Sequence, residues 1–197
     1  MEKSIYLQKI VKEILSLAGD HFLARKIGQI KFDGTDYPIF IVESRFKNPK
    51  SKNIFISAGL HGNEPGSVYA IIKFLNRNGK KLSKKFNLYI SPCLNPTGLD
   101  MECRYNFKGR DLNRDFRKVR TQEVLMLKKY LEKKKIKYDL ALDMHEDNTF
   151  YVIEGFSLKD NPRGLYFYEV YRNRKNSDFG RKIVSSFAEL FSNLWLT

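Results

Sequence analysis

The sequence predicts an α/β fold with a mixed, mostly parallel central sheet and helices on both faces of that sheet. Three short apolar runs, of the kind found in strands buried on both faces, are separated by segments with helical spacing of apolar residues. Such an alternation is typical of a sheet covered on both sides. We find no internal repeat and no dividing linker in the 197 residues, and therefore expect residues 1–197 to form a single domain.

The N-terminal part predicts one helix followed by a β-hairpin. Apolar side chains recur at helical spacing over Ile5–Leu17, and Gly19 closes this segment. Two runs rich in β-forming residues follow, over Lys26–Phe32 and Tyr37–Ser44. The short sequence Asp33-Gly34-Thr35-Asp36 separates them and is typical of a tight turn between antiparallel strands.

The middle of the chain predicts two strands of the buried type. The first covers Asn53–Ala58 and is followed by a helical pattern over Val68–Leu75. The second covers Phe86–Ser91. After it we expect a long loop over Thr97–Arg120, because this stretch is polar and contains glycine.

The last third predicts two helices and two further strands. Thr121 can cap a helix over Gln122–Lys135, which places its apolar residues on one face. Tyr138–Met144 is the third strand of the buried type, and Thr149–Phe156 predicts another strand. A closing helix is expected over Ser177–Leu194.

Unusual loop sequences follow the three strands of the buried type. These loops contain His61, Pro96 and His145, each just beyond the predicted C-terminal end of its strand. In open α/β sheets, ligands bind at the edge formed by the carboxyl ends of the strands. The fold prediction therefore gathers the three loops at one candidate site.

The composition indicates a globular protein with a basic surface. The hydrophobic fraction of 42% provides a core, and the formal net charge is +14. Much of this charge lies in short lysine runs, which are ordinarily solvated, and no nucleic-acid fold signature accompanies them. We do not expect a nucleic-acid partner; salt-sensitive binding that persists after chelation would indicate one. A basic surface can instead attract acidic substrates.

Neither a membrane span nor a secretory signal is visible in the sequence. No stretch approaches the roughly 18 consecutive apolar residues of a membrane helix, and Met1-Glu2-Lys3-Ser4 leads into an amphipathic pattern. Cys93 and Cys103 do not make a disulfide framework, although a single bridge between them stays open. We therefore expect a cytoplasmic protein that does not associate with membranes.

Two of the three histidines lie in the loops after the predicted strands and indicate a metal site. His61 and Glu64 are three positions apart at a turn from strand to helix, where Gly62 and Gly66 relax the backbone. His145 follows a neighbouring strand. Catalytic zinc takes three protein ligands of this kind and keeps one position for water. The alternative is that both histidines are ordinary loop residues satisfied by hydrogen bonds.

The segment from Asn95 to Phe116 is rich in Arg, Asn and Gly. An arginine pairs with a carboxylate through two parallel hydrogen bonds, and an adjacent asparagine adds directional ones. An arginine beside a metal can also stabilise the oxyanion that forms when water attacks a carbonyl. The alternative is an ordinary solvated basic loop.

Five motifs occur in order along the chain. They are His61-Gly62-Asn63-Glu64, Asn95-Pro96-Thr97-Gly98, Arg104-Tyr105-Asn106, Gly109-Arg110-Asp111-Leu112-Asn113-Arg114-Asp115-Phe116 and Asp143-Met144-His145. Together they resemble the zinc carboxypeptidases and their relatives, the aspartoacylase and succinylglutamate desuccinylase enzymes. The resemblance runs from about Asn53 to Glu154 and implies a zinc carboxypeptidase-like fold.

The resemblance implies roles for the residues at matching positions. Arg104 matches the arginine that polarises the scissile carbonyl, and Asn113 and Arg114 match the pair that grips the terminal carboxylate of the substrate. Asp143 lies two positions before His145 on a strand, faces the same side and is placed to hold the imidazole. The implied ligands of one zinc ion per chain are His61, Glu64 and His145.

The resemblance also exposes a gap. In the family, the glutamate that activates water comes from a strand late in the domain, and we find no late strand with a matching motif. We expect Glu154, Glu169 and Glu189 to be ordinary carboxylates. Either the domain is shortened at its C-terminus, or the base is supplied differently. A site without its base would be about 10²–10⁴-fold slower.

The function implied by the resemblance is that of a zinc metallocarboxypeptidase, which hydrolyses the C-terminal amide bond of a peptide or peptide-like substrate. The interval between Arg104 and Arg114, with Gly109 inside it, favours this branch. One alternative is an N-acyl amino-acid amidohydrolase of the aspartoacylase or desuccinylase kind. Another is an inactive remnant that binds zinc. The carboxypeptidase and the amidohydrolase would both act on a substrate with a free carboxylate.

Overall fold

The computed structural model of the protein describes residues 4–146 together with residues 182 and 185. The chain divides into two compact units, residues 1–148 and 149–197, and the account below concerns the first. The strand predicted over Thr149–Phe156 lies outside the described residues. So does the helix predicted over Ser177–Leu194, except for Lys182 and Ser185, which are both helical. The single-domain expectation stays a prediction.

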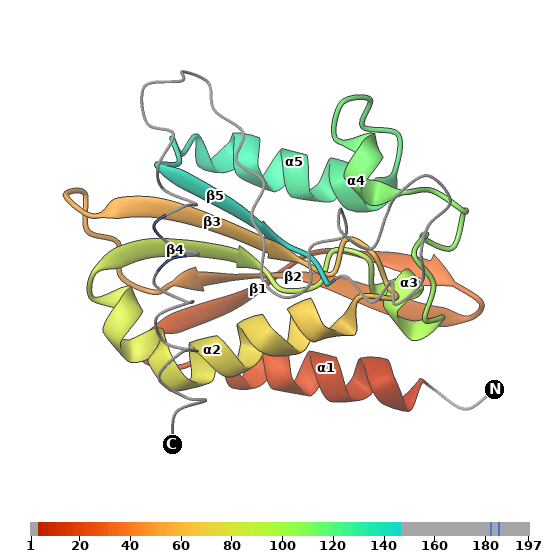
Figure 1. Cartoon of the computed structure of the whole chain (residues 1–197), viewed down its shortest axis with the longest axis horizontal. Helices are drawn as coiled ribbons and strands as arrows, with labels where there is room; N and C mark the ends of the chain where they lie inside the picture. The colour runs from red at the N-terminus through yellow and green to blue at the C-terminus, as the bar shows by residue number, and fades with distance from the viewer. Residues whose placement is uncertain (1–3, 147–181, 183–184, 186–197) are drawn as a thin grey trace. The chain divides into compact units, whose positions relative to one another are not determined.

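A five-stranded mixed sheet forms the centre of the first unit, with the order β1-β2-β4-β3-β5 (Figure 1). β1 pairs antiparallel with β2 and β2 with β4, whereas β3 pairs in parallel with both β4 and β5. Every strand except β2 therefore runs in the same direction, which confirms the predicted mixed sheet. The strand bounds are β1 Phe22–Phe32, β2 Thr35–Ser44, β3 Lys52–Ala58, β4 Phe86–Ser91 and β5 Leu140–Met144.

Helices cover both faces of this sheet, as predicted. α1 and α2 lie on one face, and α4 and α5 lie on the other (Figure 1). α2 extends beyond its predicted apolar pattern at both ends. At its N-terminus, Pro65 occupies the first helical turn, where its missing N–H costs nothing. The helix bounds are α1 Ile5–Ser16, α2 Pro65–Ser83, α3 Pro96–Asp100, α4 Leu112–Asp115 and α5 Gln122–Lys134.

Strand β2 shows how one strand supplies two cores. Phe40 and Val42 belong to the hydrophobic cluster that includes α1 and α2 residues, whereas Ile39 and Ile41 belong to the cluster that includes α5 residues. Successive side chains of a strand point to opposite faces, so an uninterrupted apolar run buries both sides of the sheet. This double burial explains why the central strands read as continuous apolar runs.

The hairpin turn agrees with the sequence prediction. β1 and β2 are joined by Asp33 and Gly34 alone, with Phe32 paired to Thr35. Both turn residues have positive φ, 47° and 70°, which is the requirement of a type I′ turn. An Asp-Gly pair meets it at low cost, because glycine has no Cβ and aspartate tolerates the left-handed region.

The stretch predicted as a long loop over Thr97–Arg120 contains two short helices, so this prediction was wrong in part. α3 and α4 are each too short to produce a visible apolar periodicity. Side-chain caps stabilise them instead: Asn95 accepts a hydrogen bond from the Gly98 N–H, and Asp111 accepts one from the Arg114 N–H. Thr121 takes the N-cap position of α5, but its hydroxyl donates to Asp115 rather than capping the helix.

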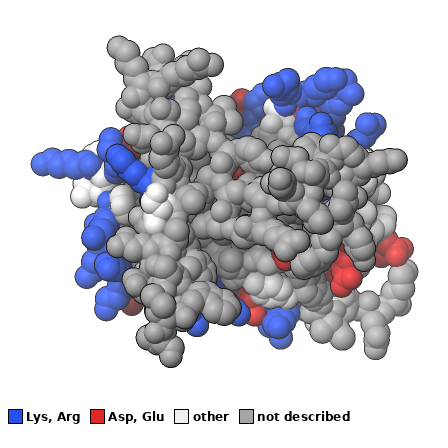
Figure 2. Space-filling model, in the orientation of Figure 1, with Lys and Arg blue, Asp and Glu red and all other residues white. Residues whose placement is uncertain are grey.

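Lysines collect at the edge of the sheet where the parallel strands begin. Figure 2 shows Lys and Arg side chains at the left margin, where Figure 1 draws the starts of β3, β4 and β5. The lysines shortly before these three strands are Lys50, Lys84, Lys85, Lys135 and Lys137. No helix in the described part of the chain is long and apolar enough to cross a membrane.

Candidate metal centre

The candidate centre lies at the carboxyl edge of the sheet. β3, β4 and β5 are parallel neighbours, so their C-terminal ends meet at one edge. The loops after these strands begin near His61, Asn95 and His145. The expectation that the fold gathers these three loops is therefore met. Since the amino ends of the same strands form the lysine-rich edge, the centre lies at the opposite end of the parallel strands.

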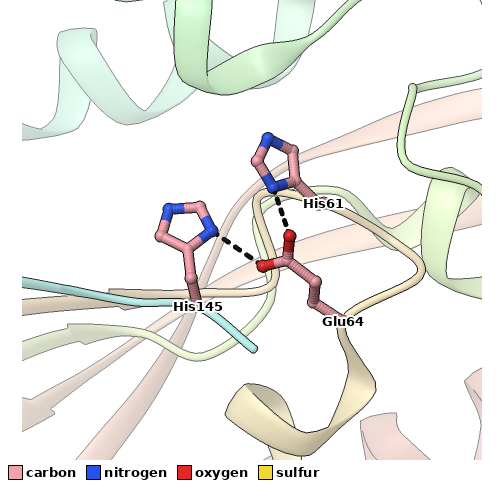
Figure 3. A group of neighbouring side chains, drawn as sticks. All are labelled: His61, Glu64 and His145. Atoms are coloured by element: carbon pink, nitrogen blue, oxygen red, sulfur yellow. Dashed lines mark hydrogen bonds and ion pairs between the residues drawn. The ribbon is translucent and has the colours of Figure 1, made fainter. Parts of the chain in front are cut away.

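His61, Glu64 and His145 converge on one point (Figure 3). The Nδ1 atom of His61 is 2.7 Å from Oε1 of Glu64, and the Nδ1 atom of His145 is 2.7 Å from Oε2 of Glu64. The two imidazole rings are 4.8 Å apart between centroids. His61 and Glu64 are buried, whereas the side chain of His145 keeps 30% of its exposure. The centre is therefore closed on one side and accessible beside His145.

Glu64 occupies the N-cap position of α2, but its side chain does not cap the helix. Its side chain makes no capping hydrogen bond, because both carboxylate oxygens face the imidazoles. The Gly66 N–H in the first turn of α2 donates instead to Oε2 of Glu146, at 2.7 Å. The backbone N–H of Glu146 in turn donates to Glu64 at 3.2 Å. Glu146 thus replaces Glu64 at the helix end and ties the segment after β5 to α2.

An outer carboxylate faces the remaining nitrogen of each histidine. Nε2 of His61 is 3.2 Å from Oδ1 of Asp111, and Nε2 of His145 is 2.9 Å from Oδ2 of Asp143. The expectation that Asp143 faces His145 is therefore met. Each imidazole has one nitrogen toward Glu64 and the other toward a carboxylate that fixes the orientation of the ring.

These contacts shift the acid–base properties of the centre. Burial alone would raise the pKa of Glu64, but hydrogen bonds from His145 and His61 outweigh it and lower that pKa to about 2. The hydrogen bonds of His145 to Asp143 and Glu64 raise the pKa of its imidazole to about 10. Burial would likewise raise the pKa of Asp111, but the hydrogen bond from His61 acts against burial, and the pKa of Asp111 is lowered. The carboxylates of Glu64 and Asp111 are thus stabilised in their charged form beside the two imidazoles.

The donor set fits a divalent metal ion. The ligating atoms of His61, Glu64 and His145 all lie within 4.8 Å of one another. Two nitrogens and a carboxylate are a ligand set that catalytic zinc uses. Metal-binding histidines commonly direct their second nitrogen to a carboxylate, as both histidines do here.

The structure brings Arg104 into the centre and leaves the predicted carboxylate-binding pair at the surface. The guanidinium of Arg104 donates to Oδ2 of Asp111 at 3.2 Å and lies 3.8 Å from Oε1 of Glu64. Arg114, on α4, has a side chain that is 86% exposed, and its Nε lies 3.7 Å from Asp111. Asn113 is also exposed on α4. Asp111 therefore connects the histidine, the arginine and this helix.

Buried asparagines hold the loop that carries Arg104. The side chain of Asn106 accepts hydrogen bonds from the backbone N–H groups of Lys108 and Arg110 and donates to the buried Glu123 of α5. The side chain of Asn95 donates to the backbone carbonyl of Leu60, next to His61. The two loops are therefore fixed to the core by internal hydrogen bonds, as a preformed site requires.

Two residues of the centre were missed in the sequence. Asp111 carries a signal in hindsight, because it stands directly before Leu112-Asn113-Arg114 and can cap a short helix. Glu146 follows His145, but its partner at the start of α2 is far away in the chain, so only the structure reveals its role. The late glutamates Glu154, Glu169 and Glu189 lie outside the described residues, and the expectation about them stays a prediction.

Comparison with known proteins agrees with this geometry. The profile of the succinylglutamate desuccinylase/aspartoacylase catalytic domain matches residues 50–166, which is more than half of the chain. The chain belongs to this family. The resemblance drawn from the five motifs is thereby confirmed. The matched region contains all three members of the histidine–glutamate cluster as well as Arg104 and Asp111.

Relatives of this family member include fungal carboxypeptidases. Carboxypeptidase 2 of Trichophyton rubrum is 30% identical over 125 residues, which covers 58% of this chain and 23% of the relative. Carboxypeptidase 2 of Trichophyton tonsurans gives the same identity and the same coverage. The chain thus spans about a quarter of the length of the curated relatives that it matches.

Solved structures of metallopeptidases share the fold. A provisionally named metallopeptidase from Shewanella denitrificans OS217 superposes with a TM-score of 0.60 at 25% identity, covering 72% of this chain and 52% of that one. A metallo-carboxypeptidase from Pseudomonas aeruginosa gives a TM-score of 0.55 at 24% identity, covering 71% of this chain and 38% of that one. These structural similarities support a carboxypeptidase-like fold for this chain. Together with the three-residue cluster, the metallopeptidase relatives imply a metal cofactor.

Proposed function

We propose that this chain forms the zinc-binding and carboxylate-gripping part of a metallocarboxypeptidase, which hydrolyses the C-terminal amide bond of a peptide or peptide-like substrate. The observation that carries the proposal is the approach of two imidazole Nδ1 atoms to the two oxygens of Glu64, with the guanidinium of Arg104 beside them. The fungal carboxypeptidase relatives support this choice of reaction.

The residues of the chain divide the work as follows. His61, Glu64 and His145 hold the metal, which when bound supplies a Lewis acid for the scissile carbonyl and for water. Arg104 places a positive charge where the oxyanion develops, and Asp111 holds its guanidinium in position. Asn113 and Arg114, whose side chains are exposed on α4, are the residues assigned to the carboxylate of the substrate.

A second candidate is an N-acyl amino-acid amidohydrolase that uses the same centre. The description of the matching family, succinylglutamate desuccinylase/aspartoacylase, favours it. The Pseudomonas aeruginosa metallo-carboxypeptidase was solved in complex with (2-guanidinoethylmercapto)succinic acid, so a dicarboxylate is a ligand of that structural neighbour. Both candidates share recognition of a carboxylate beside the amide that is cleaved.

Metal content tests the shared part of both candidates. Elemental analysis of the purified protein is expected to find about one zinc ion per chain, in line with a catalytic site of three protein ligands. His61→Ala and His145→Ala are each expected to lose the metal. His21→Ala is the matched control, because it removes the third histidine, outside the centre, and is expected to keep the metal. A wild-type protein without stoichiometric metal would contradict the hydrolase proposal.

Substrate panels separate the candidates. Release of the C-terminal amino acid from peptides supports the carboxypeptidase, whereas release of acetate or succinate from N-acyl amino acids supports the amidohydrolase. Arg104→Ala is expected to lower kcat about 10²–10³-fold in either case, as the loss of one oxyanion donor does. Stoichiometric zinc without turnover of either panel would leave a zinc-binding protein and refute both reactions.

A further inference from the structure

A buried serine lies behind the outer carboxylate of His145. Ser57 on β3 and Asp143 on β5 are register partners in the parallel pair. The Ser57 hydroxyl donates to Oδ1 of Asp143 at 2.8 Å, while Oδ2 of the same carboxylate is 2.9 Å from Nε2 of His145. A continuous chain of hydrogen bonds therefore runs from the interior of the sheet to a predicted metal ligand.

We propose that Ser57 is a positioning residue for the metal centre, which acts by fixing the Asp143 carboxylate against His145. The proposal rests on the proposed function, because it assigns His145 to the metal. When Nε2–H of His145 donates to Asp143, the lone pair of Nδ1 is available on the side of Glu64. Ser57 thereby helps to set which nitrogen of His145 the metal meets.

The exposure of Asp143 explains why this carboxylate needs an anchor. The side chain of Asp143 is 36% exposed, whereas that of Asp111, which serves His61, is only 11% exposed. Asp111 is fixed by the guanidinium of Arg104 and by the Arg114 N–H. Ser57 is the one side chain other than His145 that bonds to Asp143 among the described residues. Each histidine thus has a carboxylate, and each carboxylate has a donor of its own.

The neighbouring strand offers a matched comparison. Ser91 on β4 is the register partner of Ser57 on the other side of β3, and both serines are buried. The Ser91 hydroxyl has no hydrogen-bond partner among the described residues. A buried serine in this layer of the sheet therefore does not need a partner in order to be accommodated. Ser91→Ala removes the same atom from the same depth without touching the centre.

Zinc affinity, measured by competition with a chromogenic chelator, tests the proposal. Asp143→Ala is expected to weaken binding about 10–100-fold, as is typical of residues that hold metal ligands. Ser57→Ala is expected to weaken it about fivefold, the factor that corresponds to one net hydrogen bond. The double variant is expected to match Asp143→Ala, because Ser57 acts through Asp143. Ser91→Ala is expected to bind like wild type.

A spectroscopic measurement separates positioning from a general loss of structure. The chain has only three histidines, so nitrogen-15 spectra of the imidazoles in the zinc-loaded protein contain few signals. Ser57→Ala is expected to shift the ring signals of His145 and to leave those of His61 and His21 in place. Ser57→Thr keeps the hydroxyl and is expected to restore both the affinity and the spectrum, which preserves the test if the alanine variant does not fold.

The outcomes distinguish this proposal from the proposed function. A wild-type protein that binds no zinc overturns both. A wild-type protein that binds zinc, with Ser57→Ala at unchanged affinity and unchanged His145 signals, overturns the positioning role alone. Additive losses in the double variant also overturn it, because they would mean that Ser57 and Asp143 act separately.

Discussion

Gly62 lies so close to Gly98 that a Cβ atom on Gly62 would stand 1.9 Å from the carbonyl carbon of Gly98. Gly62 belongs to the loop after β3 and Gly98 to helix α3, so the backbones of the loop and the helix pack directly against each other beside His61. The sequence predicts that Gly62 relaxes the backbone, but the φ angle of Gly62 is not positive, unlike that of Gly59 at 62°. The close approach of a second backbone is the reason for glycine at this position.

Gly62→Ala is therefore expected to lower the free energy of unfolding by about 2–4 kcal/mol, because the added methyl overlaps backbone atoms that cannot move aside easily. Gly19→Ala is the matched control, since no atom lies within 4 Å of a Cβ built there. Urea denaturation measures both. A Gly62→Ala variant as stable as the control would contradict the packing of this loop against α3.

Asp111→Ala is expected to weaken zinc binding about 10–100-fold, because Asp111 orients His61 and holds Arg104. Chelator competition measures the affinity. The exposed Asp36 provides the control, and Asp36→Ala is expected to bind zinc normally. If the two variants bind zinc with equal affinity, Asp111 does not contribute to the metal centre.

Glu43 is a buried carboxylate on β2 that is surrounded by basic groups. It is 1% exposed, accepts hydrogen bonds from Arg25 and Lys134, and takes a third from the Tyr130 hydroxyl at 3.1 Å. Burial alone would raise the pKa of Glu43, but the hydrogen bonds from Arg25 and Lys134 outweigh it and lower that pKa. Glu43 therefore joins β1, β2 and α5 through its charged form.

Glu43→Gln is expected to cost about 1–3 kcal/mol of stability at pH 7, because it removes the charge that the basic groups pair with. A carboxyl group whose pKa is lowered by folding stabilises the protein above the pKa of the unfolded chain. That contribution is lost as the pH falls through the folded value. The stability difference between wild type and variant should thus shrink below about pH 4.5, as thermal unfolding at several pH values would measure. A difference that is constant from pH 7 to pH 3 would refute this account.

Asp115→Ala is expected to destabilise the protein by about 2–3 kcal/mol, because the buried carboxylate accepts hydrogen bonds from the backbone N–H groups of Arg120 and Thr121 and from the Thr121 hydroxyl. These bonds fix the start of α5. The exposed Asp20 serves as control. If Asp115→Ala and Asp20→Ala unfold at the same urea concentration, the anchor has no energetic role.

The sequence could predict those features that depend on local pattern. The Asp33-Gly34 turn and the bounds of β4 are examples, because turn chemistry and apolar runs act over a few residues. The convergence of His61, Glu64 and His145 could be expected, because parallel strands end at one edge. Helix α4 could not, since four residues show no periodicity and its cap, Asp111, is shared with His61. The partners of Glu43 and Glu146 come from distant segments, which a linear pattern does not reveal.

The order of the strands has a consequence for the time at which the centre forms. β5 pairs with β3 in space, but β4 and the helices α2 to α5 are synthesised between them. A nascent chain therefore presents His61 and Glu64 well before His145 leaves the ribosome. If the three residues hold a metal, two of its donors are available early and the third only after β5 has paired with β3. On the proposed function, firm metal binding would therefore report that β5 has joined β3.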